Sequence, residues 1–392
     1  MKNYIFYSTI LCAFTEALSL NIGFDLKFFY FVVFINFIIL VSFNKVIYTK
    51  GLLIFHCLVL FSGLFSCVFG YNKFGYFFIQ FFFLLLIPTY YNSFFNFFKD
   101  RFTDIASLYC KICLILAVIG FLKLPHDISI GRSFESLLLE PAHYCTIVLP
   151  AYFITLKDKS YPRYYFIIIM FSIIVSGSSL GFLGLGLSLI LMLKKISLTR
   201  VILPIIGVTF IGTFVYFNFA PFKLRVDDTV NSMVSGDLSK ANLSTYALLS
   251  NFYVSAKSFS SNPIIGNGIG SHVYSRELYL SKIEGIEVFE SINSEDLNAK
   301  DAGSLFSRVM SELGLMGLLG IFIYISKFYV KNLDEKSSIN SIICKGIMLY
   351  FFAKLFREGH YFSPEMYFFV FLYVFNKYDS SKSNNLQLAI KV

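Results

Sequence analysis

The sequence predicts an all-α integral membrane protein with about twelve transmembrane helices and one large extracytoplasmic loop. Hydrophobic residues make up 56% of the 392 residues, charged residues make up only 15%, and the mean hydropathy is +0.69. Soluble domains carry about 25% charged residues, so this chain has too little polar surface for a water-soluble globule. The apolar residues also form long runs, many close to the length that crosses a bilayer.

Twelve apolar runs approach the roughly 20 residues that a transmembrane helix needs. They are residues 4–21, 28–43, 51–70, 75–91, 104–123, 138–156, 163–176, 178–194, 200–218, 304–328, 338–356 and 361–376. The seventh and eighth are short and are separated only by a polar break around Gly177. One kinked span or a re-entrant pair are alternatives there, and either would reverse the orientation of everything downstream.

Lysine and arginine gather between alternate spans, which predicts the orientation because cytoplasmic loops are enriched in them. With the N-terminus inside, the cytoplasmic segments hold Lys2, Lys45, Lys50, Lys99, Arg101, Lys157, Lys159, Arg163, Lys194, Lys195, Arg200, Lys327, Lys331, Lys336, Lys377, Lys382 and Lys391. The short outer segments hold only Lys27, Lys73, Lys123, Arg132, Lys354 and Arg357. Merging spans seven and eight would place the cluster at 194–200 outside, so twelve spans with both ends inside fit best. Topology therefore explains the net charge of +9, and no nucleic-acid partner is expected.

This topology divides the chain into four parts. Residues 1–218 hold helices one to nine, 219–303 form the large extracytoplasmic loop, 304–377 hold helices ten to twelve, and 378–392 form a cytoplasmic tail. Within the loop, apolar residues between Thr245 and Ser260 predict a helix that lies at the membrane interface. Asn262 and Pro263 should end that helix before a glycine-rich turn.

Ionisable residues near membrane spans are costly and are therefore candidate functional residues. The first such cluster precedes span six and contains Gly131, Arg132, Glu135, Glu140 and His143. Pro141 suits the first position of a helix, which places Glu140 at the cap. An ordinary cap with interfacial charges is the alternative interpretation.

The second cluster is the loop sequence from Asn262 to His272, which contains Gly266, Gly268 and Gly270. Its exposed backbone N–H groups could bind a diphosphate. No strand–turn–helix context supports a nucleotide fold, and a simple tight turn is the alternative.

Two further clusters flank the last three spans. Arg308 and Glu312 are four residues apart and share a helix face; they could be a simple intrahelical pair. The turn before the last span holds Lys354, Arg357, Glu358, His360 and Tyr361. Snorkelling cations are the alternative there.

All four clusters lie on the outer side in this topology, which predicts one outward-facing site rich in arginine. Guanidinium groups match phosphate oxygens in pairs, so the site favours an anionic lipid headgroup or a diphosphate-linked substrate. The seven cysteines lie in apolar segments and are expected in the core. Nothing in the pattern requires a metal, and no cofactor is expected.

At these residues the chain resembles the Wzy-type O-antigen and capsular polysaccharide polymerases. The similarity lies in Arg132 followed by Glu140–Pro141, in the loop N-P-I-I-G-N-G-I-G-S-H, in R-V-M-S-E-L-G-L-M-G at span ten, and in R-E-G-H-Y before the last span. The order of about nine spans, a long outer loop and three further spans is also similar. The motifs are loose, because this family is defined more by pattern than by sequence.

The resemblance implies a metal-independent glycosyltransferase, similar in fold to the C-type glycosyltransferases, in a bacterial cytoplasmic membrane. Such enzymes join oligosaccharide units carried on undecaprenyl diphosphate at the periplasmic or outer face, in O-antigen, lipopolysaccharide or capsule biosynthesis. A chain-length regulator and a flippase are possible partners.

Residue by residue, the resemblance assigns diphosphate binding to Arg132, Arg308 and Arg357, assisted by Gly266 and Gly268. The general base is expected to be Glu140 first, His360 second and His272 third, with Glu312, Tyr361 and His143 in support. Ala142–His143 stands where a serine is common in the family. The related ligases usually carry a histidine before the span-ten glutamate, and Asp301–Ser304 stands there instead, which favours a polymerase.

Two alternatives from other classes remain open. A transporter or flippase of lipid-linked sugars would place its polar residues near the bilayer midplane, whereas here they cluster at the outer ends of the spans. A membrane anchor or assembly subunit would not need an arginine-rich site on one face, so alanine at Arg132 or Arg357 would distinguish it.

Overall fold

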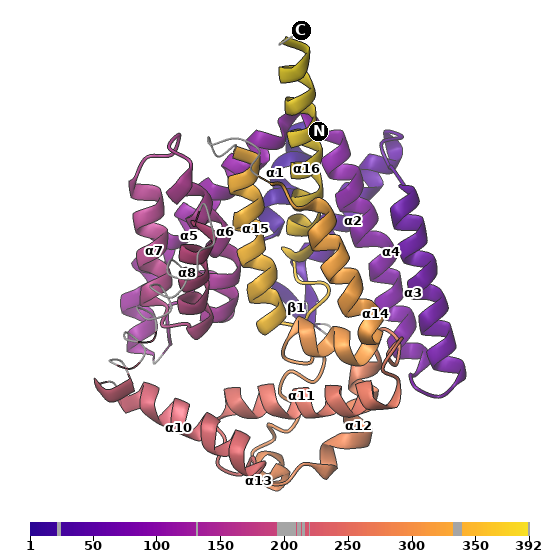
Figure 1. Cartoon of the computed structure of the whole chain (residues 1–392), viewed down its shortest axis with the longest axis vertical. Helices are drawn as coiled ribbons and strands as arrows, with labels where there is room; N and C mark the ends of the chain where they lie inside the picture. The colour runs from indigo at the N-terminus through magenta and orange to yellow at the C-terminus, as the bar shows by residue number, and fades with distance from the viewer. Residues whose placement is uncertain are drawn as a thin grey trace.

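Helices in two layers make up the protein: a bundle of roughly parallel helices and a set of helices that crosses one end of it (Figure 1). The computed structural model describes residues 1–21, 25–130, 132–193, 209, 213, 216–218, 220–331 and 339–390. Both chain termini lie at the end of the bundle opposite the crossing helices (Figure 1). The fold is all-α apart from one small hairpin among the described residues.

The bundle contains eleven of the described helices. They are α1 (Lys2–Cys12), α2 (Phe28–Ser42), α3 (Lys50–Val68), α4 (Phe74–Phe97), α5 (Phe102–Ser129), α6 (Pro141–Lys157), α7 (Tyr164–Val175), α8 (Ser179–Leu191), α14 (Leu305–Phe328), α15 (Ile339–Phe356) and α16 (Met366–Ile390), with a short 3-10 helix η1 (Lys99–Arg101) before α5. Polar caps fix several starts. Thr49 and Ser304 accept hydrogen bonds from backbone N–H groups in the first turns of α3 and α14.

Five of the described helices are long and apolar enough to cross a membrane: α3, α4, α5 with η1, α14 and α15. Large apolar side chains on them face outward, including Phe61, Ile79 and Phe322, which are 76%, 63% and 68% exposed. An exposed apolar surface of this extent is typical of contact with lipid and not with water. The all-α prediction is confirmed, and the length and composition of these five helices support a membrane location.

The predicted spans coincide with helices in most places. α7 and α8 are two separate helices of 12 and 13 residues, with Gly177 in a left-handed conformation between them. This excludes one continuous helix there and is compatible with both two spans and a re-entrant pair. The predicted span at 200–218 lies almost wholly outside the described residues.

The first and last spans differ from prediction. α1 ends at Cys12, and the antiparallel strands β1 (Ser19–Asn21) and β2 (Asp25–Lys27) follow. An 11-residue helix rises roughly 16 Å, which is about half of a bilayer core. The reason is Glu16, which is buried in a polar cluster and cannot face lipid. At the other end, residues 361–365 form a turn, so α16 begins five residues later than expected.

The large loop folds into α10 (Ala220–Ser235), α11 (Leu243–Ser261), α12 (Ser271–Tyr279), the 3-10 helix η2 (Leu280–Lys282) and α13 (Ile286–Ser291). It has a small apolar core of its own, in which the rings of Tyr246 and Phe289 stack with centroids 3.7 Å apart. α11 confirms the helix predicted before Asn262. Its buried residues include Ser250, Asn251 and Ser255, which pack against protein rather than lipid.

The loop joins the bundle at a break in α14. Gly314 has φ 60° and ψ −153°, so the helix is interrupted there. The backbone N–H groups of Leu315 and Met316 donate to the carbonyls of Pro263 and Ile264. This contact fixes the loop to the end of the bundle that carries the polar clusters.

Candidate active site

An ion pair at the surface joins the start of α6 to the end of α15. Glu140 is the N-cap of α6, and Pro141 occupies the first helical position, where a missing N–H group costs little. Arg357 directly follows α15, and its Nη2 lies 3.7 Å from Oε2 of Glu140. The Arg357 and Glu140 side chains are 25% and 47% exposed, so both stay accessible. Two predicted clusters therefore meet here.

A largely buried cluster of one histidine and two glutamates lies beside this ion pair. Nδ1 of His143, one helical turn after Glu140, lies 2.8 Å from Oε2 of Glu16. One ring nitrogen of His143 and one oxygen each of Glu16 and Glu358 lie within 4.8 Å of one another. The exposed fraction falls from 17% for His143 to 3% for the side chains of Glu16 and Glu358. Side-chain exposure thus decreases from the Arg357–Glu140 ion pair to the buried carboxylates of Glu16 and Glu358.

Lys354 is a buried cation that pairs with the carboxylates of this cluster. Its Nζ lies 2.6 Å from Oε1 of Glu358 and 3.1 Å from Oε1 of Glu365. It also donates to Ser363 Oγ, and the hydroxyl of Tyr350 donates to Glu365. Burial raises the pKa of Glu358 to about 7, so this carboxyl can hold a proton near neutral pH.

The charges around His143 nearly balance. The cluster contains three carboxylates, those of Glu16, Glu358 and Glu365. Two ammonium groups oppose them: Lys354 pairs with Glu358 and Glu365, and Lys27 Nζ lies 3.8 Å from Glu16. One further proton, carried by His143 or by Glu358, would balance the remaining negative charge. Glu16, His143 and Glu358 have the composition of a cation site. However, Lys27 and Lys354 already form ion pairs with its two carboxylates.

Arg308 ties three parts of the chain together. Its Nε lies 3.3 Å from Glu312 Oε1, Nη1 donates to the carbonyl of Gly359 at 3.1 Å, and Nη2 donates to Gln80 Oε1 at 2.7 Å. The guanidinium also lies over the Tyr361 ring, 4.1 Å from its centroid. Arg308 is only 2% exposed. The structure gives it an organising role, which differs from the direct diphosphate contact expected from the sequence.

Gly359 shows how tightly the turn before α16 is seated. A Cβ at this position would lie 1.8 Å from the carbonyl oxygen of Asp301. The neighbouring Glu358 has φ 69°, and its N–H donates to the carbonyl of Gly303. Close packing of residues 301–304 against this turn places Arg357 and Glu358 beside α6.

The glycine-rich loop packs onto α14. The N–H of Gly266 donates to Asn262, and that of Gly268 donates to the carbonyl of Glu312 at 2.8 Å. A Cβ at Gly266 would lie 2.4 Å from the Glu312 backbone. Both amides are therefore occupied, and these glycines have a packing role in place of the expected diphosphate contact.

His272 is fully buried behind that loop. Nε2 lies 3.1 Å from Asn251 Oδ1, and Nδ1 lies 3.2 Å from Ser311 Oγ. Asn251 Oδ1 also accepts from the buried Arg276. Burial, with nearby Arg308 and Arg276, lowers the pKa of His272 to about 3. With both nitrogens engaged, His272 would have to lose these bonds to act as a base.

His360 is constrained differently. Its Nδ1 accepts a hydrogen bond from the backbone N–H of Phe362 at 3.0 Å. Burial and the cations around it, including Lys27, lower the pKa of His360 well below its usual value. The ring is therefore neutral with its proton on Nε2, which makes it a hydrogen-bond donor and not a base.

Arg132 lies on the surface of the connection between α5 and α6. Its Nη1 is 3.5 Å from Glu135 Oε1, and its side chain is 62% exposed. Lys123 Nζ approaches the same carboxylate at 3.6 Å. Arg132 is thus the most accessible of the three predicted arginines.

Some residues of the site escaped the sequence prediction. Glu16 and Gln80 contact predicted cluster residues that are distant from them in sequence, whereas Glu365 lies only 11 residues after Lys354, its ion-pair partner. Glu16 carried a usable signal, because it is the only charged residue in the predicted span 4–21. Glu365 carried the same signal, as the only charged residue in the predicted span 361–376, whereas the uncharged Gln80 did not.

An apolar cavity of about 180 Å³ lies between α14, α15 and α16. Its lining includes Val309, Leu313 and Val370, and it reaches Lys354 and Tyr361 at the polar site. A lipid chain could occupy the cavity while its polar head meets the charged residues.

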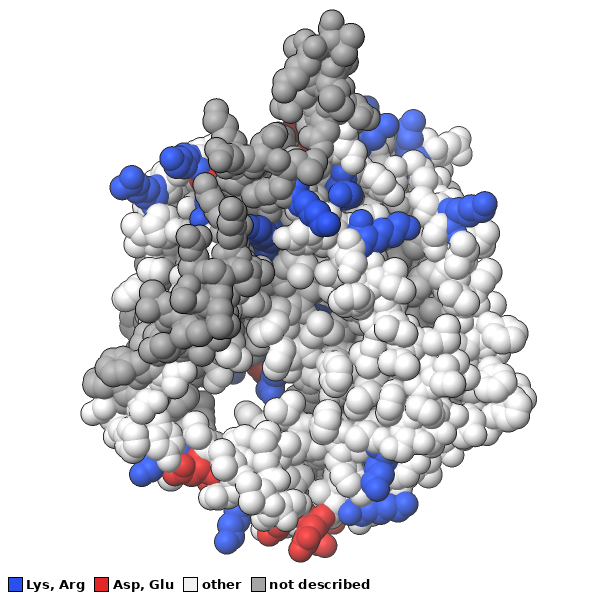
Figure 2. All heavy atoms as spheres, in the orientation of Figure 1, with Lys and Arg blue, Asp and Glu red and all other residues white. Residues whose placement is uncertain are grey.

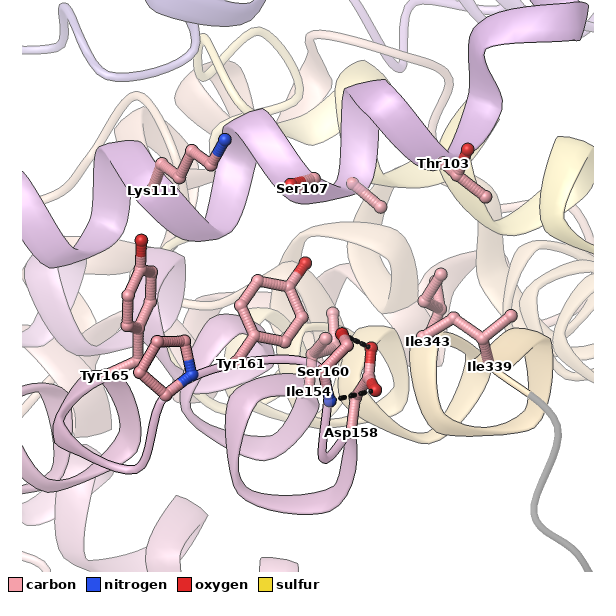
Figure 3. Close-up of a pocket in the computed structure, with 12 residues that line it drawn as sticks. Thr103, Ser107, Lys111, Ile154, Asp158, Ser160, Tyr161, Tyr165, Ile339 and Ile343 are labelled. Carbon is pink, nitrogen blue, oxygen red and sulfur yellow. Dashed lines mark hydrogen bonds between the residues drawn. The ribbon is translucent and has the colours of Figure 1, made fainter.

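A second cavity of about 380 Å³ lies at the opposite end of α6 (Figure 3). Ile154 and Asp158 line it, roughly 25 Å along the helix from Glu140. Figure 3 shows both oxygens of Asp158 directed to Ser160, which donates through N and Oγ at 2.9 Å. That carboxylate is satisfied within its own turn, so the charged cluster at the other end is the stronger candidate.

No protein-family model matches the chain, and no curated protein is significantly similar to it. The fold and the site define a helical membrane protein with a charged, partly open site where the loop meets the bundle.

Proposed function

We propose that this protein is a membrane glycosyltransferase that polymerises undecaprenyl-diphosphate-linked oligosaccharide units into a surface polysaccharide. The observation that carries the proposal is the Arg357–Glu140 pair. It is accessible to solvent and lies next to the largely buried cluster of His143, Glu16 and Glu358. It combines a guanidinium suited to phosphate with groups able to accept a proton.

The apolar cavity supports a lipid-linked substrate. It lies among α14, α15 and α16 and ends at Lys354 and Tyr361. A polyprenyl chain with its first isoprene units in this cavity, and the rest among the membrane lipids, would bring its diphosphate toward the Arg357 side of the site. A water-soluble sugar nucleotide would gain nothing from an apolar cavity there.

The distribution of surface charge supports an outward-facing site. In Figure 2, lysine and arginine gather near the end that carries the termini, whereas the opposite end shows both signs of charge. The positive-inside rule assigns the first end to the cytoplasm. The twelve-span topology, with the loop and the site at the outer face, is therefore part of the proposal.

In the proposed reaction, Arg357 and the exposed Arg132 bind the diphosphate of the donor and stabilise charge on the leaving group. A hydroxyl of the acceptor sugar loses its proton to a carboxylate or imidazole and attacks the anomeric carbon of the donor. The bond from that carbon to the diphosphate oxygen breaks, and undecaprenyl diphosphate leaves with the electron pair. Arg308 holds Tyr361 and the turn at Gly359 in place.

Polysaccharide laddering on a gel tests the proposal. Cells that lack the gene are complemented with wild type, Arg357→Ala or Arg132→Ala at matched protein levels. Single-repeat products in the deletion strain, with a ladder restored only by wild type, would support polymerisation at this site. Long chains that remain intact but unattached in the deletion strain would favour a ligase. An unchanged ladder would contradict both and favour transport.

A further inference from the structure

The pairing of Glu16 with His143 has the geometry of a carboxylate that orients a catalytic imidazole. Glu16 Oε2 lies 2.8 Å from Nδ1 of His143 and is buried. A carboxylate in this position accepts the Nδ1 proton and leaves Nε2 as the basic nitrogen. Within the described part of the chain, no hydrogen bond engages Nε2 of His143.

The location of the imidazole fits a role in proton transfer. His143 is 17% exposed, so it is not sealed from the accessible part of the site. It follows Glu140 by one turn of α6, and Glu140 pairs with Arg357. His143 therefore lies directly beside the proposed diphosphate site, whereas His272 and His360 have their basic nitrogens engaged.

We infer that His143 is the general base of the proposed polymerisation and that Glu16 is its positioning residue. The inference rests on the proposed function. The acceptor hydroxyl gives its proton to Nε2 of His143 as its oxygen bonds to the anomeric carbon of the donor. The bond to the diphosphate breaks in the same step, and the imidazolium then returns its proton to the solvent.

Several charged groups set the proton affinity of this imidazole from the elements packed around it. They are Glu16 in the turn after α1, Lys27 at the end of β2, Glu140 at the cap of α6, Lys354 on α15, and Glu358 and His360 in the turn before α16. The carboxylates favour the imidazolium and the ammonium groups oppose it. Removing the charge of Glu16 should therefore make His143 a weaker base.

The test is the pH profile of chain elongation by purified protein in liposomes, with an undecaprenyl-diphosphate-linked repeat unit as substrate. We expect His143→Gln to lower kcat by about 10²–10⁴-fold with little change in KM. Glu16→Gln keeps a hydrogen-bond acceptor but removes the charge, so the rise of activity with pH should move to lower pH by about 1–3 units. His126→Gln, at an exposed histidine on α5, is the matched control and should resemble wild type.

Each other outcome has a distinct meaning. An unshifted profile in Glu16→Gln, or near-normal turnover in His143→Gln, would overturn the dyad while leaving polymerisation intact. Loss of the pH-dependent limb in Glu140→Gln alone would make Glu140 the base. Activity that chelator abolishes and Mg²⁺ or Mn²⁺ restores would assign the cluster to a metal instead. A wild-type protein that elongates nothing would overturn the proposed function itself.

Discussion

Nδ1 of His143 lies 2.8 Å from Oε2 of Glu16, although the two residues are 127 positions apart in the chain. The contact joins the turn after α1 to the first turn of α6. It lies beside Arg357, which belongs to a third segment, and this convergence gives the site its chemistry.

Arg357→Ala should abolish the polysaccharide ladder, because the side chain is the accessible guanidinium next to the buried cluster. Arg357→Lys should restore it in part, since lysine supplies the charge but not the paired N–H donors. Ladder length at matched membrane levels is the measurement. A full-length ladder in Arg357→Ala would contradict the diphosphate role.

Gly359→Ala should destabilise the protein by about 3 kcal/mol or more, because its Cβ would overlap the carbonyl oxygen of Asp301. The thermal midpoint of the detergent-purified protein measures this effect. Gly320→Ala on α14 is the control, because nothing lies within 4 Å of a Cβ there. Equal midpoints for the two variants would show that the turn can move away from residues 301–304.

Arg308→Leu should cost about 3–5 kcal/mol of stability, because it leaves the Glu312 carboxylate buried without its partner. The double variant Arg308→Leu with Glu312→Leu should recover part of that loss, since both charges are then removed. Thermal midpoints of the single and double variants provide the comparison. Strictly additive losses would contradict the coupling of the two side chains.

Part of the fold and of the site follows from local properties of the sequence, and part depends on contacts between distant segments. The helices and the outer clusters were predictable, because apolar length and misplaced charge are local properties. The partnership of Glu16 with His143 was not, since it depends on α1 ending early and on how distant helices pack. The hydrogen-bond partners of the Gly266 and Gly268 amides were not predictable either. A sequence does not show whether a backbone N–H group binds a ligand or a carbonyl oxygen of the same chain.

Stability should fall as the pH is lowered, partly because of His272. Its pKa is about 3 in the folded protein and about 6.5 in an unfolded chain, so unfolding takes up a proton between these values. The resulting stabilisation is complete above pH 6.5 and declines as the pH falls toward 3. Thermal midpoints from pH 7 to pH 4 should fall less steeply in His272→Gln than in wild type. The exposed His126→Gln variant should keep the wild-type slope, and an equally steep slope in His272→Gln would contradict the assignment.

Leu313→Trp should weaken use of the lipid-linked donor, because it fills the apolar cavity between α14, α15 and α16. Leu319→Trp on the same helix is the control, since Leu319 is 49% exposed on the outer surface. The KM for the lipid-linked unit should rise in the first variant and not in the second. Identical KM values would show that the lipid chain binds elsewhere.

Elongation by the purified protein in liposomes, supplied only with an undecaprenyl-diphosphate-linked repeat unit, tests the central claim most directly. We predict products with several repeats, formed in the presence of EDTA by wild type and absent with Arg357→Ala. A wild-type protein that leaves the unit unextended, with or without divalent metal ions, would contradict the proposal that this site polymerises lipid-linked sugars.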